Sequence, residues 1–161
     1  MAGAENVRYS ISSMKVYIGA DHNGFAMKQM LTEELTRAGY QVVDEGDTAL
    51  NPEDDFPQFA AKAVAALKAS EDSEPRAILI CGSGQGMCMA ANRYKGVRAS
   101  LVWNVEEARA SRNDDDANVL CLPSRYMSTE DAVKLAEVWL ATPFAGAARF
   151  KRRIKELDEL Q

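Results

Sequence analysis

The stretch 76-RAILICGSGQGMCMAAN-92 runs from a short apolar segment through a glycine-rich turn into a segment of helical composition. Residues 76–81 have the length and apolar character of a buried strand. Gly82, Gly84 and Gly86 permit positive φ angles and let the backbone approach a ligand closely. A buried strand that turns directly into a helix is the repeating unit of parallel α/β folds, so this stretch indicates the fold class.

The same unit recurs along the chain. Short apolar strands are predicted at residues 15–20, 40–46, 76–81, 97–103 and 118–123. Helices are predicted at residues 25–39, 58–70, from the glycine turn to 94, and at 104–112, 129–142 and 145–160, with Asn104 and Ser128 as N-caps. Short strands that are apolar throughout and alternate with helices predict an α/β fold, with a five-stranded parallel sheet covered by helices on both faces.

Composition and charge limit the kinds of partner. The chain has 161 residues, 47% of them hydrophobic, and a net charge of -5, which suits one acidic domain with one core. An acidic chain gives no reason to expect nucleic acid or an anionic membrane as a partner, and no apolar run reaches the roughly 20 residues that span a bilayer. Residues 1–14 have no apolar signal segment and are predicted to be a flexible leader to a single domain over residues 15–161.

The cysteines and the histidine bear on location and metal binding. The chain has three cysteines, Cys81, Cys88 and Cys121, and no CxxC pair. Their odd number argues against a disulfide framework and predicts location in the cytoplasm. With His22 as the one histidine, the usual zinc sites lack ligands, so no metal is expected.

Three polar or reactive segments lie at the carboxyl ends of predicted strands: 19-GADHNGF-25, 44-DEG-46 and 81-CGSGQG-86. Right-handed crossovers place the carboxyl ends of parallel strands at one edge of the sheet. Ligands bind at that edge, where the strand order reverses. We therefore expect the three segments to meet in one site.

The residue types in these segments leave two interpretations open. Cys81 is either a small core residue or a thiolate that acts as nucleophile or general base. Asp21 and His22 either cap and pack locally or bind a hydroxyl group and an anion. The GSGQG turn is either a tight turn or an anion site, and it lacks both the GK[ST] of a P-loop and the spacing of a dinucleotide-binding loop.

The C-terminal segment 149-RFKRRIKEL-157 is basic in an otherwise acidic chain. Arg149 and Arg153 are four residues apart, so they share one helix face. Two guanidinium groups on one face either clamp a phosphate or form a solvated basic surface.

Seven segments, taken in order, resemble the ribose-5-phosphate isomerase B / galactose-6-phosphate isomerase family of sugar-phosphate isomerases. They are GADHNGFAMK, VVDEG, DFPQFAAKAV, ILICGSGQGMCMAANR, GVRASL, SRNDDDANVL and RFKRR, which together extend from about residue 15 to the C-terminus. The resemblance implies a Rossmann-like three-layer α/β/α sandwich and a phosphorylated sugar as substrate, without metal or other cofactor. It also implies a homodimer or tetramer whose active sites are shared between subunits.

The resemblance also implies the catalytic roles. Cys81 would be the base that moves a proton between C1 and C2 of the sugar through a cis-enediolate. Ser83 would shuttle protons between the two oxygens. The backbone amides of Gly82, Gly84 and Gly86 would hold the developing oxyanion.

Substrate binding is implied for residues outside the glycine turn. Asp21 would bind sugar hydroxyls. His22, together with Arg149 and Arg153 of the neighbouring subunit, would bind the phosphate.

The chain departs from the family pattern in two places. Asp114 and Asp115 stand where the family commonly has His-Asn, and that histidine is credited with opening the sugar ring. Phe150 stands where many relatives have a second histidine on the phosphate side. The departures leave aldose–ketose isomerisation as the expected activity, with ribose 5-phosphate as the first candidate substrate.

Three alternatives remain open. A tetrose 4-phosphate cannot close a five-membered ring, so it would need no ring-opening residue, whereas Asp114 could open a pentose ring if its pKa were raised. A non-catalytic subunit of a mixed isomerase assembly is a second alternative, against which the presence of Cys81 argues. A cysteine hydrolase is the third, although the usual sequence cues around its cysteine are absent.

Overall fold

The structure is a computed structural model that describes residues 14–160. Its five strands form one parallel sheet in the order β2-β1-β3-β5-β4, which confirms the predicted architecture. The strands are β1 (Lys15–Ala20), β2 (Gln41–Asp44), β3 (Arg76–Cys81), β4 (Ala99–Leu101) and β5 (Val119–Pro123).

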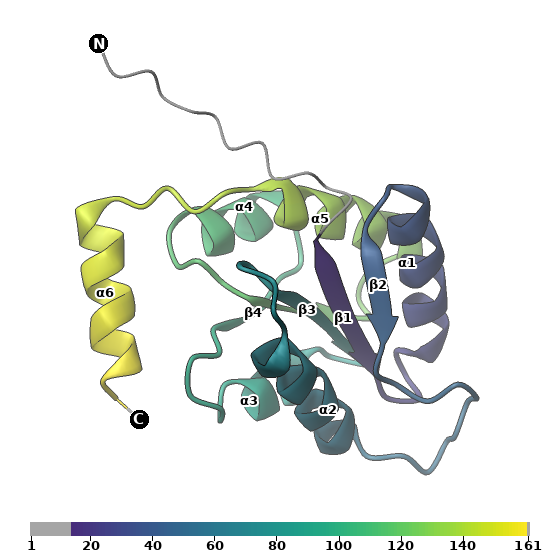
Figure 1. The fold of residues 1–161 in the computed structure, drawn as a ribbon. Coiled ribbons are helices and arrows are strands. Elements are labelled where there is room, and N and C mark those ends of the chain that lie inside the picture. Colours follow the sequence, from purple (N-terminus) through teal and green to yellow (C-terminus); the bar gives the residue numbers. More distant parts are fainter. Residues whose placement is uncertain (1–13, 161) are drawn as a thin grey trace.

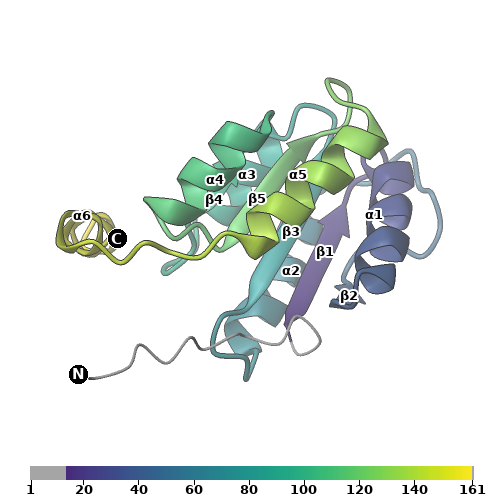
Figure 2. The ribbon, with the colours of Figure 1, turned by 90° about the horizontal axis from the view of Figure 1, so that it is seen from above.

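Helices cover both faces of the sheet and give three layers (Figures 1 and 2). One face packs against α1, α4 and α5 around Leu31 and Trp139, and the other packs against α2 and α3 around Phe59 and Met87. The helices are α1 (Phe25–Arg37), α2 (Phe56–Ala69), α3 (Gln85–Ala91), α4 (Val105–Asn113), α5 (Thr129–Ala141) and α6 (Ala148–Asp158). Because both faces are covered, every residue of β3 is buried, which explains its apolar run over residues 77–81.

Local sequence signals set the helix ends. The side chain of Asn104 accepts a hydrogen bond from the backbone N–H of Glu107 at 2.8 Å, and that of Ser128 accepts one from Asp131 at 3.1 Å, so both predicted N-caps are confirmed. α2 begins at Phe56, earlier than the predicted residue 58, because proline fits the first helical turn, where no intrahelical N–H is needed.

The edge strand β4 is shorter than the predicted range 97–103. The backbone N–H of Arg98 donates to the side-chain oxygen of Asn118 at 2.8 Å, so this residue leaves the regular ladder. Three residues, Ala99–Leu101, remain in the strand.

The last helix stands apart from the layered body. Both views show α6 at one side, joined to α5 by an extended segment (Figures 1 and 2). Phe150 is its one buried residue, and Leu157 is 49% exposed. The helix therefore has apolar side chains that the body of the same chain does not cover.

Two predictions concern the ends of the chain and membranes. The leader predicted over residues 1–14 lies outside the described residues, apart from Met14, whose carbonyl accepts a hydrogen bond from the backbone N–H of Gln41 at 3.1 Å. Within residues 14–160, no helix is both long and apolar enough to cross a membrane.

The strand order reverses at β1. The chain passes from β1 to β2 on one side and then crosses over to β3 on the other side. The carboxyl ends of β1 and β3 therefore border the crevice in which proteins of this architecture bind ligands.

Candidate functional site

Cys81 ends β3 at this crevice. Its side chain is buried, and the backbone N–H of Gly84 donates a hydrogen bond to its sulfur at 3.1 Å. The turn can fold back this tightly because Gly84 has a φ of 72° and a Cβ at that position would lie 2.5 Å from the side chain of Leu101. An N–H group aimed at the sulfur is suited to stabilise the negative charge of a thiolate.

The rest of the glycine turn brings neighbours close to the backbone. The hydroxyl of Ser83 accepts a hydrogen bond from a backbone N–H at the start of α3, at 3.3 Å. A Cβ on Gly82 would lie 2.9 Å from Nε of Arg125, and one on Gly86 would lie 2.8 Å from the ring of Phe56. The guanidinium of Arg125 therefore lies against the turn at Gly82.

Asp21 lies at the end of β1 and is buried. One of its carboxylate oxygens accepts hydrogen bonds from the backbone N–H groups of Asn23 at 3.0 Å and Gly24 at 3.2 Å. Its own backbone N–H donates to the carbonyl of Ile80 at 3.3 Å. Asp21 thus closes the turn between β1 and α1 and ties it to β3 beside Cys81.

His22 is held by a carboxylate from a distant loop. Its Nδ1 lies 2.7 Å from Oδ1 of Asp54, and its backbone N–H donates to the same oxygen at 2.9 Å. The side chain of Asp54 is 4% exposed, whereas that of His22 is 33% exposed. The hydrogen bond to Asp54 raises the pKa of His22 above its ordinary value; partial burial opposes this rise, and the charge of Asp21 adds to it.

Arg125 follows β5 at the same edge of the sheet. Its guanidinium donates a hydrogen bond to the side-chain oxygen of Asn23 at 3.3 Å, and the side-chain nitrogen of Asn23 lies 3.2 Å from Nε2 of His22. The backbone N–H of Arg125 donates to the carbonyl of Gly82 at 3.0 Å. A guanidinium and an imidazole therefore flank the cysteine turn, a pairing suited to bind a phosphate.

Three residues of this edge, Asn23, Asp54 and Arg125, are missing from the candidates that the sequence indicates. Arg125 comes shortly after the strand predicted at 118–123, so the rule that placed the other segments at this edge could have found it. Asp54 lies in an acidic loop in which no local pattern distinguishes it from its neighbours.

The remaining predicted residues lie elsewhere in the chain. Asp114 and Asp115 follow α4 and precede β5, so they lie at the opposite edge of the sheet from the glycine turn. Arg153 is on α6, near enough for its charge to oppose the rise in the pKa of Asp115. The guanidinium of Arg149 lies over the ring of Phe150, 4.4 Å from its centre.

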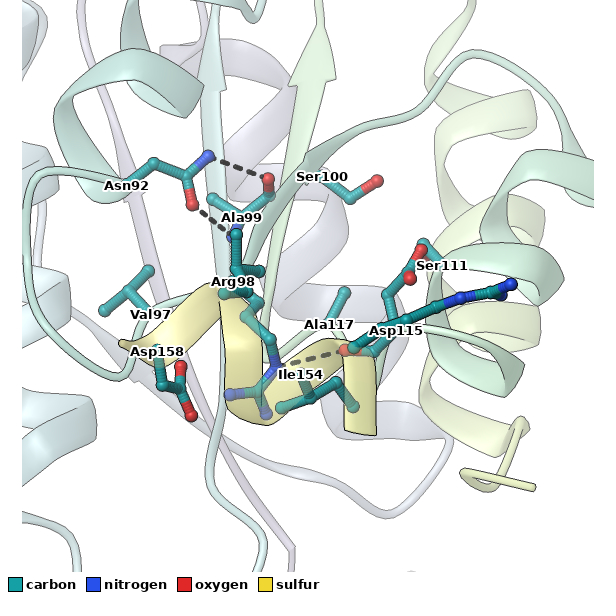
Figure 3. A pocket seen from close by; sticks show the side chains of 12 residues that line it. Asn92, Val97, Arg98, Ala99, Ser100, Ser111, Asp115, Ala117, Ile154 and Asp158 are labelled. Carbon is teal, nitrogen blue, oxygen red and sulfur yellow. Dashed lines mark hydrogen bonds between the residues drawn. The ribbon is translucent and has the colours of Figure 1, made fainter. Parts of the chain in front are cut away.

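A hollow of about 490 Å³, called here the α6 hollow, lies between α6 and the β4 edge (Figure 3). Its lining includes Arg98, Ser100, Ser111, Asp115, Arg153 and Ile154. Nε of Arg98 donates a hydrogen bond to the backbone carbonyl of Asp115 at 3.0 Å (Figure 3). Burial raises the pKa of the Asp115 carboxyl, and the charge of Asp114 adds to the rise.

One chain does not bring the α6 hollow and the cysteine turn to the same ligand. Cys81 pairs with the last residue of β5, whereas Asp115 precedes the first. The five residues of β5 span about 15 Å at roughly 3.3 Å per residue. The predicted site residues therefore form two separate groups within the monomer.

Of the other two cysteines, Cys88 is on α3 and Cys121 is on β5. A hydrogen bond with Cys121 lowers the pKa of Cys88 to about 7. Complete burial raises the pKa of Cys121 well above its ordinary value. Both thiols are free, and Cys88 also contacts the carbonyl of Ala99 at 3.4 Å.

The sequence model of the Ribose/Galactose Isomerase family matches residues 16–157. The chain belongs to this family. A probable ribose-5-phosphate isomerase B from Mycoplasma pneumoniae is 41% identical over 137 residues, which cover 85% of this chain and 89% of the relative. Ribose-5-phosphate isomerase B from Escherichia coli is 32% identical over 147 residues, which cover 91% of this chain and 96% of the relative.

Solved structures of this isomerase family share the whole fold. The ribose 5-phosphate isomerase from Thermotoga maritima matches with a TM-score of 0.86 and 37% identity, over 91% of this chain and 99% of that one. Ribose-5-phosphate isomerase B from Mycoplasma genitalium, solved with bound ribulose-5-phosphate, matches with a TM-score of 0.85 and 38% identity, over 92% of this chain and 96% of that one. The resemblance noted from the sequence and the Rossmann-like sandwich are both confirmed, and the chain is an aldose–ketose isomerase.

Proposed function

We propose that this isomerase interconverts ribose 5-phosphate and ribulose 5-phosphate, with Cys81 as the base. The observation that carries the proposal is the Cys81 sulfur, which accepts the N–H of Gly84 at 3.1 Å in the crevice between β1 and β3. The relatives support the substrate, because their names give ribose 5-phosphate and one of them binds ribulose-5-phosphate.

The reaction moves one proton between two carbons. The Cys81 thiolate removes the proton on C2 of the open-chain aldose, and the electrons of that C–H bond form the C1=C2 bond of the cis-enediolate. The carbonyl electrons move to O1, where amides of the glycine turn stabilise the charge. Cys81 then returns its proton to C1, while Ser83 carries the hydroxyl proton from O2 to O1 and leaves the ketone.

Two cations of the same chain flank this turn and are proposed to bind the phosphate. Arg125 lies over Gly82, and His22 lies beyond Asn23, which contacts both side chains. Hydrogen bonds from charged donors to phosphate are shorter and stronger than neutral ones. The phosphate would take the place of Asn23 between the two cations.

The proposal includes a second copy of the chain. A partner that places its cysteine turn against the α6 hollow would bring Arg149, Arg153 and Asp115 to the substrate. Leu157, 49% exposed on α6, supports a contact of this kind because it offers apolar surface to a partner. We therefore propose a homodimer, or a tetramer of such dimers, working in the cytoplasm, where its three free thiols would stay reduced.

A tetrose 4-phosphate is the second candidate substrate. Asp114 and Asp115 favour it, because they replace the histidine that the family resemblance credits with ring opening, and a tetrose 4-phosphate has no five-membered ring to open. Asp115, with its raised pKa, is in turn the residue that could still open a pentose ring.

Steady-state kinetics with ribose 5-phosphate, erythrose 4-phosphate and galactose 6-phosphate would test the proposal. We expect the highest kcat/KM with ribose 5-phosphate and the loss of turnover in Cys81→Ala. A higher kcat/KM with erythrose 4-phosphate would replace the proposed substrate by a tetrose. If none of the three sugars is turned over, the chain is a binding subunit or acts on another phosphosugar, and the proposal fails.

A further inference from the structure

Asp54 contacts both the backbone and the side chain of His22. The side-chain Nδ1 of His22 lies 2.7 Å from Oδ1 of Asp54, and the backbone N–H of His22 donates to the same oxygen at 2.9 Å. A single carboxylate oxygen therefore fixes both the backbone and the ring of one residue. The ring has little rotational freedom left, and its other nitrogen, Nε2, points toward Asn23 at 3.2 Å.

The loop that carries Asp54 is held at both ends. At its start, Nζ of Lys28 on α1 contacts both carboxylate oxygens of Asp44 at 2.8 Å and the carbonyl of Asp47 at 2.8 Å. Near its end, the backbone N–H of Asp54 donates to the carbonyl of Asn51 at 3.2 Å. The position of the Asp54 carboxylate is thus set by the fold before any ligand binds.

Charge and geometry favour one protonation pattern of the ring. Nδ1 faces a carboxylate that is 4% exposed, so this nitrogen carries a proton. The charged groups that face His22 are Asp54 and Asp21, which raise its pKa, and Arg125, which lowers it. The amide nitrogen of Asn23 can only donate, so Nε2 accepts in this contact. When a phosphate takes the place of Asn23, Nε2 takes up a proton and becomes a donor directed toward the space beside Arg125.

We propose that Asp54 is a positioning residue for the reaction, which orients the His22 ring and keeps it positively charged for the substrate phosphate; this rests on the proposed function. Asp54 touches neither the sugar nor the reacting carbons. It acts through His22 alone, so its removal weakens substrate binding and leaves the proton transfer at Cys81 intact.

Asp54→Asn tests the charge separately from the geometry, because the amide keeps an oxygen acceptor at the same place. Glu53→Gln is the matched control, since it removes one charge from the same loop at an exposed residue. His22 is the one histidine of the sequence, so the signal of its Hε1 ring proton can be assigned without ambiguity in untagged protein. We expect Asp54→Asn, and not Glu53→Gln, to lower the pKa of His22, and added inorganic phosphate to shift this signal less in Asp54→Asn than in the wild type.

Kinetics give the second readout. At a pH between the His22 pKa values of the two proteins, as the NMR titration measures them, we expect the KM of Asp54→Asn for ribose 5-phosphate to rise about tenfold with kcat within about twofold, because a charged hydrogen bond to the phosphate is lost. The difference in KM should shrink at about pH 5.5, where the imidazole of both proteins is protonated. In a His22→Asn background, Asp54→Asn should add no further rise in KM.

An unchanged His22 titration in Asp54→Asn, or a further rise in KM without His22, overturns the role of Asp54. If Asp54→Asn does not fold, Asp54→Glu, which keeps the charge, must retain the wild-type His22 pKa for the proposal to stand. If the wild type turns over no phosphosugar, the proposed function fails, while the NMR titration with inorganic phosphate still decides whether Asp54 sets the charge of His22.

Discussion

At the residue scale, we predict that the choice of sugar depends on Asp115. Its raised pKa keeps the carboxyl protonated to a higher pH than an ordinary aspartate, so it can donate a proton to a ring oxygen. We predict that Asp115→Asn lowers kcat/KM for ribose 5-phosphate by about tenfold or more and leaves that for erythrose 4-phosphate within about twofold. In the wild type, activity on the pentose should fall relative to the tetrose as the pH rises through the Asp115 pKa.

Asp114→Asn is the control for this prediction, because it removes the neighbouring charge without removing the Asp115 proton donor. It should lower the pKa of Asp115 and therefore move the pH profile to lower pH. If Asp115→Asn lowers kcat/KM equally for both sugars, Asp115 contributes to substrate binding or to folding and does not open the ring.

Cys88 on α3 and Cys121 on β5 are predicted to differ in their reactivity. With a pKa of about 7, Cys88 should be alkylated by iodoacetamide with a midpoint near that pH, whereas Cys121 should stay unmodified in the folded protein. Cys121→Ala removes the hydrogen bond, so it should raise the midpoint for Cys88 toward the ordinary thiol value. Mass spectrometry of the peptide that contains Cys88 measures this, and an unchanged midpoint would show that Cys121 does not set its pKa.

Residues at strand ends could be predicted from the sequence, whereas their loop partners could not. Cys81, Asp21 and His22 follow apolar strands, and parallel topology brings all strand ends to one edge. Asp54 is 32 residues from His22 and meets it only because the loop after β2 folds back over the edge. Contacts of that kind depend on tertiary structure, which a local pattern does not encode.

Among the elements, α6 was predicted correctly as a helix, but its position relative to the cysteine turn could not be predicted from the sequence. The spacing of Arg149 and Arg153 predicted a shared helix face, and the helix is present, but the structure places it away from the cysteine turn of its own chain. A sequence pattern gives the period of a helix but not the chain against which it packs. The central strands β1, β3 and β5 were easier to predict, because burial on both faces makes them mostly apolar.

The basic face of α6 is predicted to act on binding. Removing one guanidinium, in Arg149→Ala or Arg153→Ala, should raise KM for the phosphosugar about tenfold and change kcat much less, because a charged contact to the phosphate is lost. Lys151→Ala is the matched control, since successive residues are about 100° apart and Lys151 therefore lies on another side of the helix. Equal effects of Lys151→Ala and Arg153→Ala would mean that α6 contributes only general positive charge.

At the scale of the whole molecule, the proposed homodimer builds each site from two chains, with the cysteine turn from one and the α6 residues from the other. Cys81→Ala and Arg149→Ala/Arg153→Ala each disable one group, so each variant alone should be nearly inactive at low substrate concentration. After mixing and reassociation, half of the dimers are mixed and each has one intact site, so about a quarter of the wild-type activity should return. Activity assays after dissociation and refolding of the mixture measure this recovery. If no activity returns, the two groups of residues do not form a shared active site.

Most of these predictions depend on the proposed role of Cys81, which transfers a proton on a pentose phosphate. The most direct test is deuterium incorporation at C2 of ribose 5-phosphate in D2O, followed by NMR, with wild type, Cys81→Ala and Cys88→Ala. We predict exchange with the wild type and Cys88→Ala, and a rate lower by about 10³-fold or more in Cys81→Ala. Exchange that persists in Cys81→Ala, or no exchange in the wild type, would contradict it.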